Sequence, residues 1–107
     1  MNNEELEKLG WEFKTYWKNR GIYELGIGNI FEHNGSVGII YKKELIYCNL
    51  SDEELKEYTD IIIQLNDLEG HPDKHTYLEA LNMYKKEMKF VERMLEKANG
   101  DENKDDE

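Results

Sequence analysis

The stretch Ile30–Tyr41, which reads IFEHNGSVGIIY, decides the fold, because an Asn34-Gly35 pair separates two runs of β-forming residues. A two-residue hairpin turn needs positive φ at both central positions, and Asn and Gly tolerate it best. After a turn near residues 42–44, the apolar run Leu45–Cys48 predicts a third strand. Residues 22–50 are therefore expected to form an antiparallel hairpin or a three-stranded meander.

Two helices are predicted after this β region. Ser51 and Glu54 form a capping box ahead of an apolar face, so the first of these helices should span 51–68. Thr76 and Glu79 form a second capping box and begin a helix over 76–98, which Asn99-Gly100 should end. The buried side of this last helix is predicted to carry Leu78, Leu81, Tyr84, Met88, Val91 and Leu95.

A helix is also predicted before the β region, over residues 3–18. Its apolar side chains recur every three or four residues, at Leu6, Leu9, Phe13, Tyr16 and Trp17. Trp11 lies off this stripe, so either it folds under the neighbouring strands or the helix breaks at Gly10. The predicted fold is α+β: an N-terminal helix, then the antiparallel sheet, then two C-terminal helices on one face of the sheet. Residues 1–98 should form one domain, and residues 99–107 a disordered acidic tail.

The charge of the chain narrows the classes of function. The 107 residues include 24 acidic and 14 basic side chains, for a net charge of −10. Direct binding to nucleic acid or to an anionic membrane uses clustered Lys and Arg, so we expect neither. A single cysteine and the absence of a basic, then apolar, N-terminal segment lead us to expect a cytoplasmic protein.

No arrangement of residues predicts catalysis. Cys48 lies in a β-forming run and is interpreted as a small buried side chain. His71 and His75 have a spacing that metal ligands can use, but Pro72 places them in a loop and no further ligand is indicated. We therefore expect no metal, no cofactor and no enzymatic activity, with a metal-dependent enzyme at these two histidines as a distant alternative.

The acidic side chains concentrate on the helix predicted at 51–68. Residues 51–70 carry seven acids and one base, and the residues that fall on the face opposite the apolar one are Glu53, Glu57, Asp60 and Asp67. We call these four residues the acidic ridge. The ridge is interpreted either as a solvated face, in part paired with bases of the last helix, or as a surface that binds a basic partner.

Two apolar features are alternative binding surfaces. The last helix carries a second apolar edge, made of Met83, Phe90 and Met94, that either is buried or docks a partner. Trp11, if exposed, would anchor a partner in the same way.

The predicted function is stoichiometric binding. Antitoxins, immunity proteins and phage-borne inhibitors, including anti-CRISPR proteins and DNA mimics, share this small, acidic, non-enzymatic profile. The expected partner is a protein with a basic surface, which the acidic ridge would bind and inhibit. The alternative is a structural or regulatory module that forms a homodimer through the edge of Met83, Phe90 and Met94.

Deletion of residues 100–107 should leave the melting temperature within a few degrees of the full-length value. The deleted segment has no apolar side chain to bury, so its removal costs little packing energy. Calorimetry of the two chains measures this, and a larger drop would mean that the tail is docked.

Overall fold

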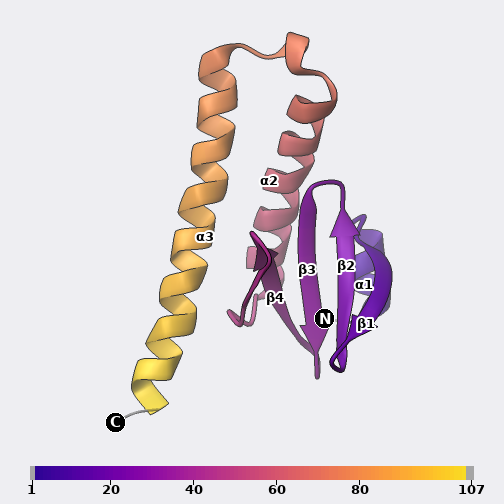
Figure 1. Ribbon diagram of the computed structural model, residues 1–107, viewed down its shortest axis with the longest axis vertical. Helices are drawn as coiled ribbons and strands as arrows, with labels where there is room; N and C mark the ends of the chain where they lie inside the picture. The colour runs from indigo at the N-terminus through magenta and orange to yellow at the C-terminus, as the bar shows by residue number, and fades with distance from the viewer. Residues whose placement is uncertain (1, 106–107) are drawn as a thin grey trace.

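The computed structural model describes the backbone of residues 2–105 and the side chains of residues 2–100. The elements follow in the order α1 (Asn3–Lys8), β1 (Glu12–Trp17), β2 (Arg20–Leu25), β3 (Gly28–His33), β4 (Ser36–Tyr41), β5 (Glu44–Ile46), α2 (Asp52–Gly70), the 3-10 turn η1 (Pro72–Lys74) and α3 (Tyr77–Asp105). The strands form one antiparallel sheet in the order β1-β2-β3-β4-β5, and α2 and α3 stand beside it as a helical hairpin (Figure 1). The α+β fold is therefore as predicted.

The hairpin at Asn34-Gly35 is confirmed. His33 pairs with Ser36, and the two turn residues have φ values of +52° and +82°. β5 supplies the third strand that the sequence predicts, pairing Ile46 with Ile39. The sheet nevertheless has five strands rather than three, because β1 and β2 extend the meander on the other side of β3.

The helix predicted over residues 3–18 is wrong beyond Lys8. α1 ends in a Schellman motif, in which the Trp11 N–H donates to the Leu6 carbonyl oxygen (3.1 Å) and the Gly10 N–H to that of Glu7 (3.0 Å). Gly10 has φ of +106°, which only glycine adopts without strain. The aromatic residues that follow then favour an extended strand, β1, whose bulge between Phe13 and Thr15 disturbs the alternation of its faces.

α2 and α3 form largely as predicted. Ser51 caps α2, since its hydroxyl accepts from the Glu54 N–H (3.1 Å) and its own N–H donates to Glu54 Oε1 (2.8 Å). The Thr76–Glu79 capping box is also present at the start of α3. α3 does not end at Asn99-Gly100, however, but continues as a helix to Asp105. Residues 106–107 of the predicted tail lie outside the described part of the chain.

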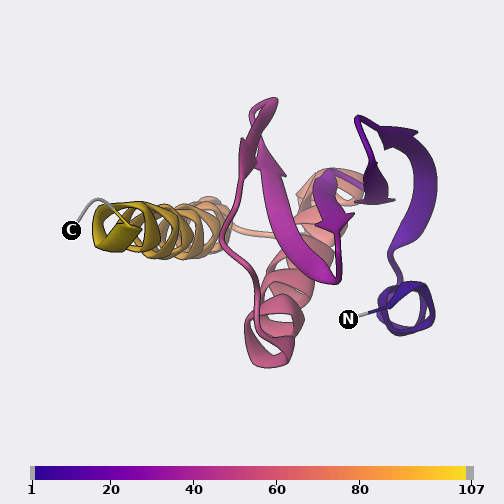
Figure 2. The ribbon, with the colours of Figure 1, turned by 90° about the horizontal axis from the view of Figure 1, so that it is seen from below.

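α2 is fixed to the sheet by a polar contact as well as by its apolar face. The Asn66 side chain accepts from the Ile27 N–H (2.9 Å) and donates to the Leu25 carbonyl oxygen (3.0 Å). It thereby satisfies the backbone of the β2–β3 turn. The apolar face of α2 packs on the sheet face that carries Ile30 and Ile39. No helix covers the opposite face of the sheet in the described chain (Figure 2).

A stack of three aromatic rings crosses the core. The Trp11 and Tyr58 ring centroids lie 6.1 Å apart, and those of Tyr58 and Phe90 lie 5.2 Å apart, with interplanar angles of 10° and 19°. The Trp11 indole N–H donates to the Thr59 hydroxyl oxygen (2.9 Å), and that hydroxyl donates to the Leu55 carbonyl oxygen (2.6 Å). The stack thus joins the segment after α1 to α2 and α3.

Within the described residues, no helix combines the length and the apolar character needed to cross a bilayer.

Trp11→Phe should lower the free energy of unfolding by about 1 kcal/mol or more, because the ring remains but the buried Thr59 hydroxyl loses its donor. Trp17→Phe is the matched control, since Trp17 is 45% exposed and surface substitutions change stability by about 0.5 kcal/mol or less. Urea unfolding measures both variants. Equal stability of the two would show that the Trp11–Thr59 hydrogen bond contributes little.

Candidate acidic binding site

The acidic ridge lies on the outward face of α2, as predicted. Glu53, Glu57, Asp60 and Asp67 are all exposed. The opposite side of the same helix buries Leu55, Tyr58, Ile62 and Leu65 in the core. The ridge is therefore carried by a helix whose rotation is set by packing, and its carboxylates are presented along one line.

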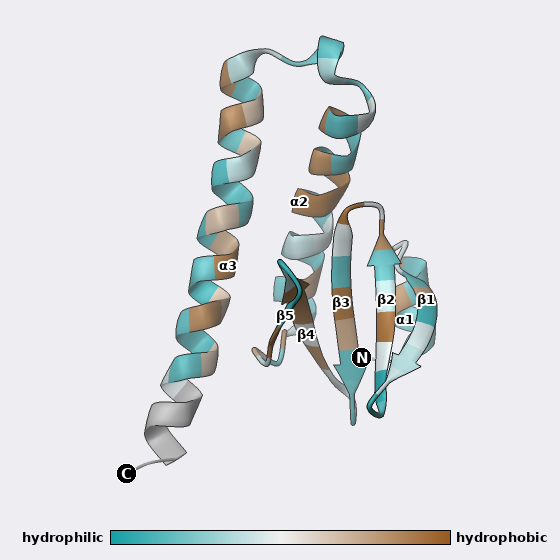
Figure 3. Ribbon diagram, in the orientation of Figure 1, coloured by the Kyte–Doolittle hydropathy of each residue, from teal (hydrophilic) through white to brown (hydrophobic). Residues whose placement is uncertain are grey.

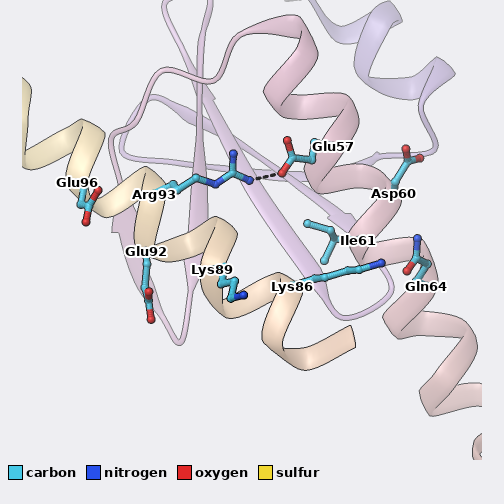
Figure 4. Close-up of a pocket in the computed structure, with 9 residues that line it drawn as sticks. All are labelled: Glu57, Asp60, Ile61, Gln64, Lys86, Lys89, Glu92, Arg93 and Glu96. Carbon is cyan, nitrogen blue, oxygen red and sulfur yellow. Dashed lines mark hydrogen bonds and ion pairs between the residues drawn. The ribbon is translucent and has the colours of Figure 1, made fainter. Parts of the chain in front are cut away.

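A groove runs between the ridge and α3. It has a volume of about 660 Å³ and is lined on the α2 side by Glu57, Asp60, Ile61 and Gln64, and on the α3 side by Lys86, Lys89, Glu92, Arg93 and Glu96. Figure 4 shows the Arg93 side chain reaching across the groove to form an ion pair with Glu57. The Lys86 side chain extends from α3 toward Gln64 (Figure 4). Charges of both signs therefore line the groove, with a buried apolar floor at Ile61.

Part of the acidic charge of α2 is paired within the chain. Glu57 is held by Arg93, and Asp67 Oδ2 lies 3.0 Å from His75 Nε2. By contrast, Glu53 and Asp60 form no ion pair with any described residue. The ridge is therefore paired at Glu57 and Asp67, and its charge is available to a partner mainly at Glu53 and Asp60.

Glu54 lies beside the ridge and is the most enclosed of these carboxylates. Lys97 Nζ approaches Glu54 Oε1 to 2.7 Å and also donates to the Asn49 carbonyl oxygen (2.8 Å). Partial burial acts to raise the pKa of Glu54, but the Lys97 ammonium and the Ser51 backbone N–H outweigh it, so the pKa is lowered overall. This interaction ties the C-terminal half of α3 to the start of α2.

The apolar edge predicted as a docking surface is not exposed. Phe90 and Met94 are 0% and 3% exposed, and Met83 is half-buried against the core. Phe90 is buried because its ring completes the stack on Tyr58. The prediction that Met83, Phe90 and Met94 bind a partner is therefore wrong for this structure.

Trp11 is likewise a core residue rather than an exposed anchor. It is 1% exposed and its indole N–H is satisfied by Thr59. The break at Gly10 turns its side chain under the sheet instead of leaving it on the far side of a long helix. Trp11 cannot contact a partner in this conformation.

His71 and His75, whose spacing could suit metal ligands, differ in exposure and in the side chains around them. His71 is exposed and follows the last residue of α2, whereas His75 lies between Asp67 and Glu79, whose Oε2 is 3.8 Å from its Nδ1. Among the described residues, no group of three or more His, Cys, Asp or Glu side chains is arranged to hold a metal ion.

Cys48 is completely buried, and burial raises the pKa of its thiol. A protonated, enclosed thiol is a poor nucleophile. Its surroundings are those of a core side chain, which is the interpretation that the sequence favours.

An exposed aromatic cluster on the uncovered face of the sheet was missed at the level of sequence. The Arg20 guanidinium carbon lies 5.5 Å from the ring centroids of both Trp17 and Tyr47. Tyr47 in turn packs edge-on against Phe31, 5.0 Å away. Trp, Tyr and Arg are the residues that most often anchor protein interfaces. The concentration of β-forming aromatic and threonine residues at 12–17 was the signal that could have revealed this cluster.

Comparison of the chain with protein-family models, with curated proteins and with solved structures gave no match. Its function is therefore inferred from the residues and the geometry described above.

Glu54→Gln should lower the free energy of unfolding by about 1 kcal/mol at pH 7, because Lys97 loses its charged partner while an amide oxygen still accepts from Ser51. A carboxylate whose folded pKa is lowered stabilises the fold above its unfolded pKa, and this contribution is lost as the pH falls. The difference between wild type and variant should accordingly shrink below pH 4.5, the ordinary pKa of this carboxyl.

Urea unfolding at several pH values from about 3 to about 7 measures this dependence. Glu53→Gln removes the same charge from the neighbouring, unpaired position and serves as the control. A pH-independent loss in Glu54→Gln would assign the effect to packing rather than to the ion pair with Lys97.

Proposed function

We propose that this protein acts by stoichiometric binding, without catalysis, and that the acidic ridge of α2 binds and inhibits a protein with a basic surface. The observation that carries the proposal is the exposure of Glu53 and Asp60, which form no ion pair with any described residue, in a chain of net charge −10. Folding alone does not require two unpaired carboxylates on the same line of a helix, because they repel each other and their neighbours.

The rigidity of α2 supports this proposal. From Glu53 to Asp67 the ridge extends about 21 Å along the helix axis, at 1.5 Å per residue. Its positions are fixed by the capping box at Ser51, by the buried face of α2 and by the Asn66 contact with the β2–β3 turn. A preorganised row of carboxylates loses little entropy on binding.

The charge also favours a partner whose own ligand is a polyanion. A carboxylate row on a rigid helix can occupy a groove built for phosphates. The features of this chain therefore fit an inhibitor of a nucleic-acid-binding protein, such as a phage-borne inhibitor or a DNA mimic. Long-range attraction between opposite charges raises the association rate and is weakened by salt. We place the protein in this class, alongside immunity proteins and antitoxins.

The ridge is tested by the double charge reversal Glu53→Lys/Asp60→Lys. Both residues are exposed and unpaired, so the fold should be retained and the stability should change by about 1 kcal/mol or less. Glu57 is left intact because its reversal would place a lysine against Arg93. The reversal should abolish capture, by immobilised protein, of the partner that the wild type retains from host lysate at low salt.

The matched control is Glu44→Lys/Asp73→Lys, which makes the same change in net charge at two exposed positions outside α2 and outside the acidic ridge. The purified partner should bind this control as it binds the wild type, with an association rate that falls as salt is raised. If the ridge variant binds the partner as tightly as the wild type does, the proposal is refuted. If both variants lose binding to the same extent, net charge rather than the acidic ridge determines binding, and the proposal is refuted as well.

A further inference from the structure

α3 has a second apolar face that nothing in the described chain covers. Tyr77, Leu78, Tyr84, Met88 and Leu95 are 77%, 70%, 41%, 54% and 41% exposed. Together they expose on the order of 500 Å² of side chain, which is the size of the largest apolar patch on a typical monomer, and such a patch is often functional. We call these five residues, with the half-buried Leu81, the α3 stripe. Hydrophobic colours recur along the described length of α3 (Figure 3).

The α3 stripe is distinct from the face that α3 uses within the chain. Phe90, Val91 and Met94 face the core, where Phe90 stacks on Tyr58. The groove side of the helix carries Lys86, Lys89 and Arg93. The stripe therefore occupies a third side of a 29-residue helix. Of the side predicted to be buried, Val91 is in the core but Leu78, Tyr84, Met88 and Leu95 are exposed, whereas Phe90 and Met94 of the predicted docking edge are buried.

The spacing along this side is that of a coiled coil. Exposed or half-buried apolar side chains follow one another at intervals of four, three, four and seven residues, at Tyr77, Leu81, Tyr84, Met88 and Leu95, while the intervening Val91 belongs to the core. The seven-residue repeat from Leu81 through Met88 to Leu95 is the pattern of a helix that packs lengthwise against another helix. Within the chain, α2 contacts the other side of α3, so the second helix must come from another molecule.

Charges beside the stripe identify a second copy, in antiparallel orientation, as the occupant. Lys85 and Glu92 occupy equivalent flanking positions one heptad apart. When two copies of α3 run antiparallel, with Tyr84 of one facing Leu95 of the other, Lys85 lies beside Glu92, twice by symmetry. A parallel pairing would instead bring Glu87 of one copy near Glu92 of the other.

We propose that two copies of this chain associate through the α3 stripe as an antiparallel helix pair. The contact uses residues that the acidic ridge does not, so it goes beyond the proposed inhibitory function and does not depend on it. The apolar area is modest, and we expect a reversible dimer with a dissociation constant on the order of 10 µM.

Sedimentation equilibrium of the full chain over a range of concentrations tests the proposal. The wild type should be dimeric at high concentration, and Met88→Gln/Leu95→Gln should weaken association at least about tenfold, a loss of about 1.4 kcal/mol. Ile63→Gln, at an apolar side chain of α2 that is 48% exposed, should associate like the wild type. A wild type that stays monomeric at about ten times the expected dissociation constant would overturn the proposal.

Orientation and folding are checked with the same measurement. Lys85→Glu should weaken the dimer, and Lys85→Glu/Glu92→Lys should restore it, whereas an unchanged dimer in Lys85→Glu would refute the antiparallel register. Circular dichroism and urea unfolding should show that all variants keep the fold. The ridge variant Glu53→Lys/Asp60→Lys should still dimerise, so that failure of either proposal is recognised separately.

Discussion

Three aromatic rings, those of Trp11, Tyr58 and Phe90, form a stack that joins the segment after α1 to α2 and α3. Tyr58 on α2 lies between the other two, so the position of α2 fixes both the turn that follows α1 and the face that α3 turns inward. The indole hydrogen bond to Thr59 sets the orientation of the first ring. All three rings are buried, so truncating any one of them would leave a void in the core, and voids of this kind are costly.

The stack also explains which surfaces are left for function. Because α3 turns Phe90, Val91 and Met94 toward the core, the apolar side chains on another side of the helix, those of the α3 stripe, remain exposed or half-buried. Because Arg93 and Lys97 lie on the side of α3 that faces α2, they pair with Glu57 and Glu54. The acidic ridge and the α3 stripe thereby lie on different helices, the first on the outer side of α2 and the second on α3.

The parts of the fold that could be predicted are those decided by neighbouring residues. Asn34-Gly35 dictates its turn by backbone conformation alone, and Ser51 with Glu54 begins α2 through hydrogen bonds three residues apart. The exposure of the acidic ridge could be predicted because the apolar residues of the same helix, which must be buried, lie on its opposite face.

What the sequence left undecided depends on distant contacts. Phe13, Tyr16 and Trp17 fit a helical stripe as well as a bulged strand, and pairing with β2 decides between them. α3 is apolar over so much of its circumference that its own residues do not say which face is buried. The ring of Tyr58, far away in the sequence, makes that choice.

The strand order of the sheet bears on how the chain reaches this structure. Each strand pairs with the one before it, through turns as short as Lys18-Asn19 and Lys42-Lys43. Closing such small loops costs little chain entropy, and chains rich in local pairing fold fast. The meander can therefore assemble as the residues become available, whereas Phe90 must wait for Tyr58. We expect the docking of α3 to be the last event in folding, and its release to be the first in unfolding.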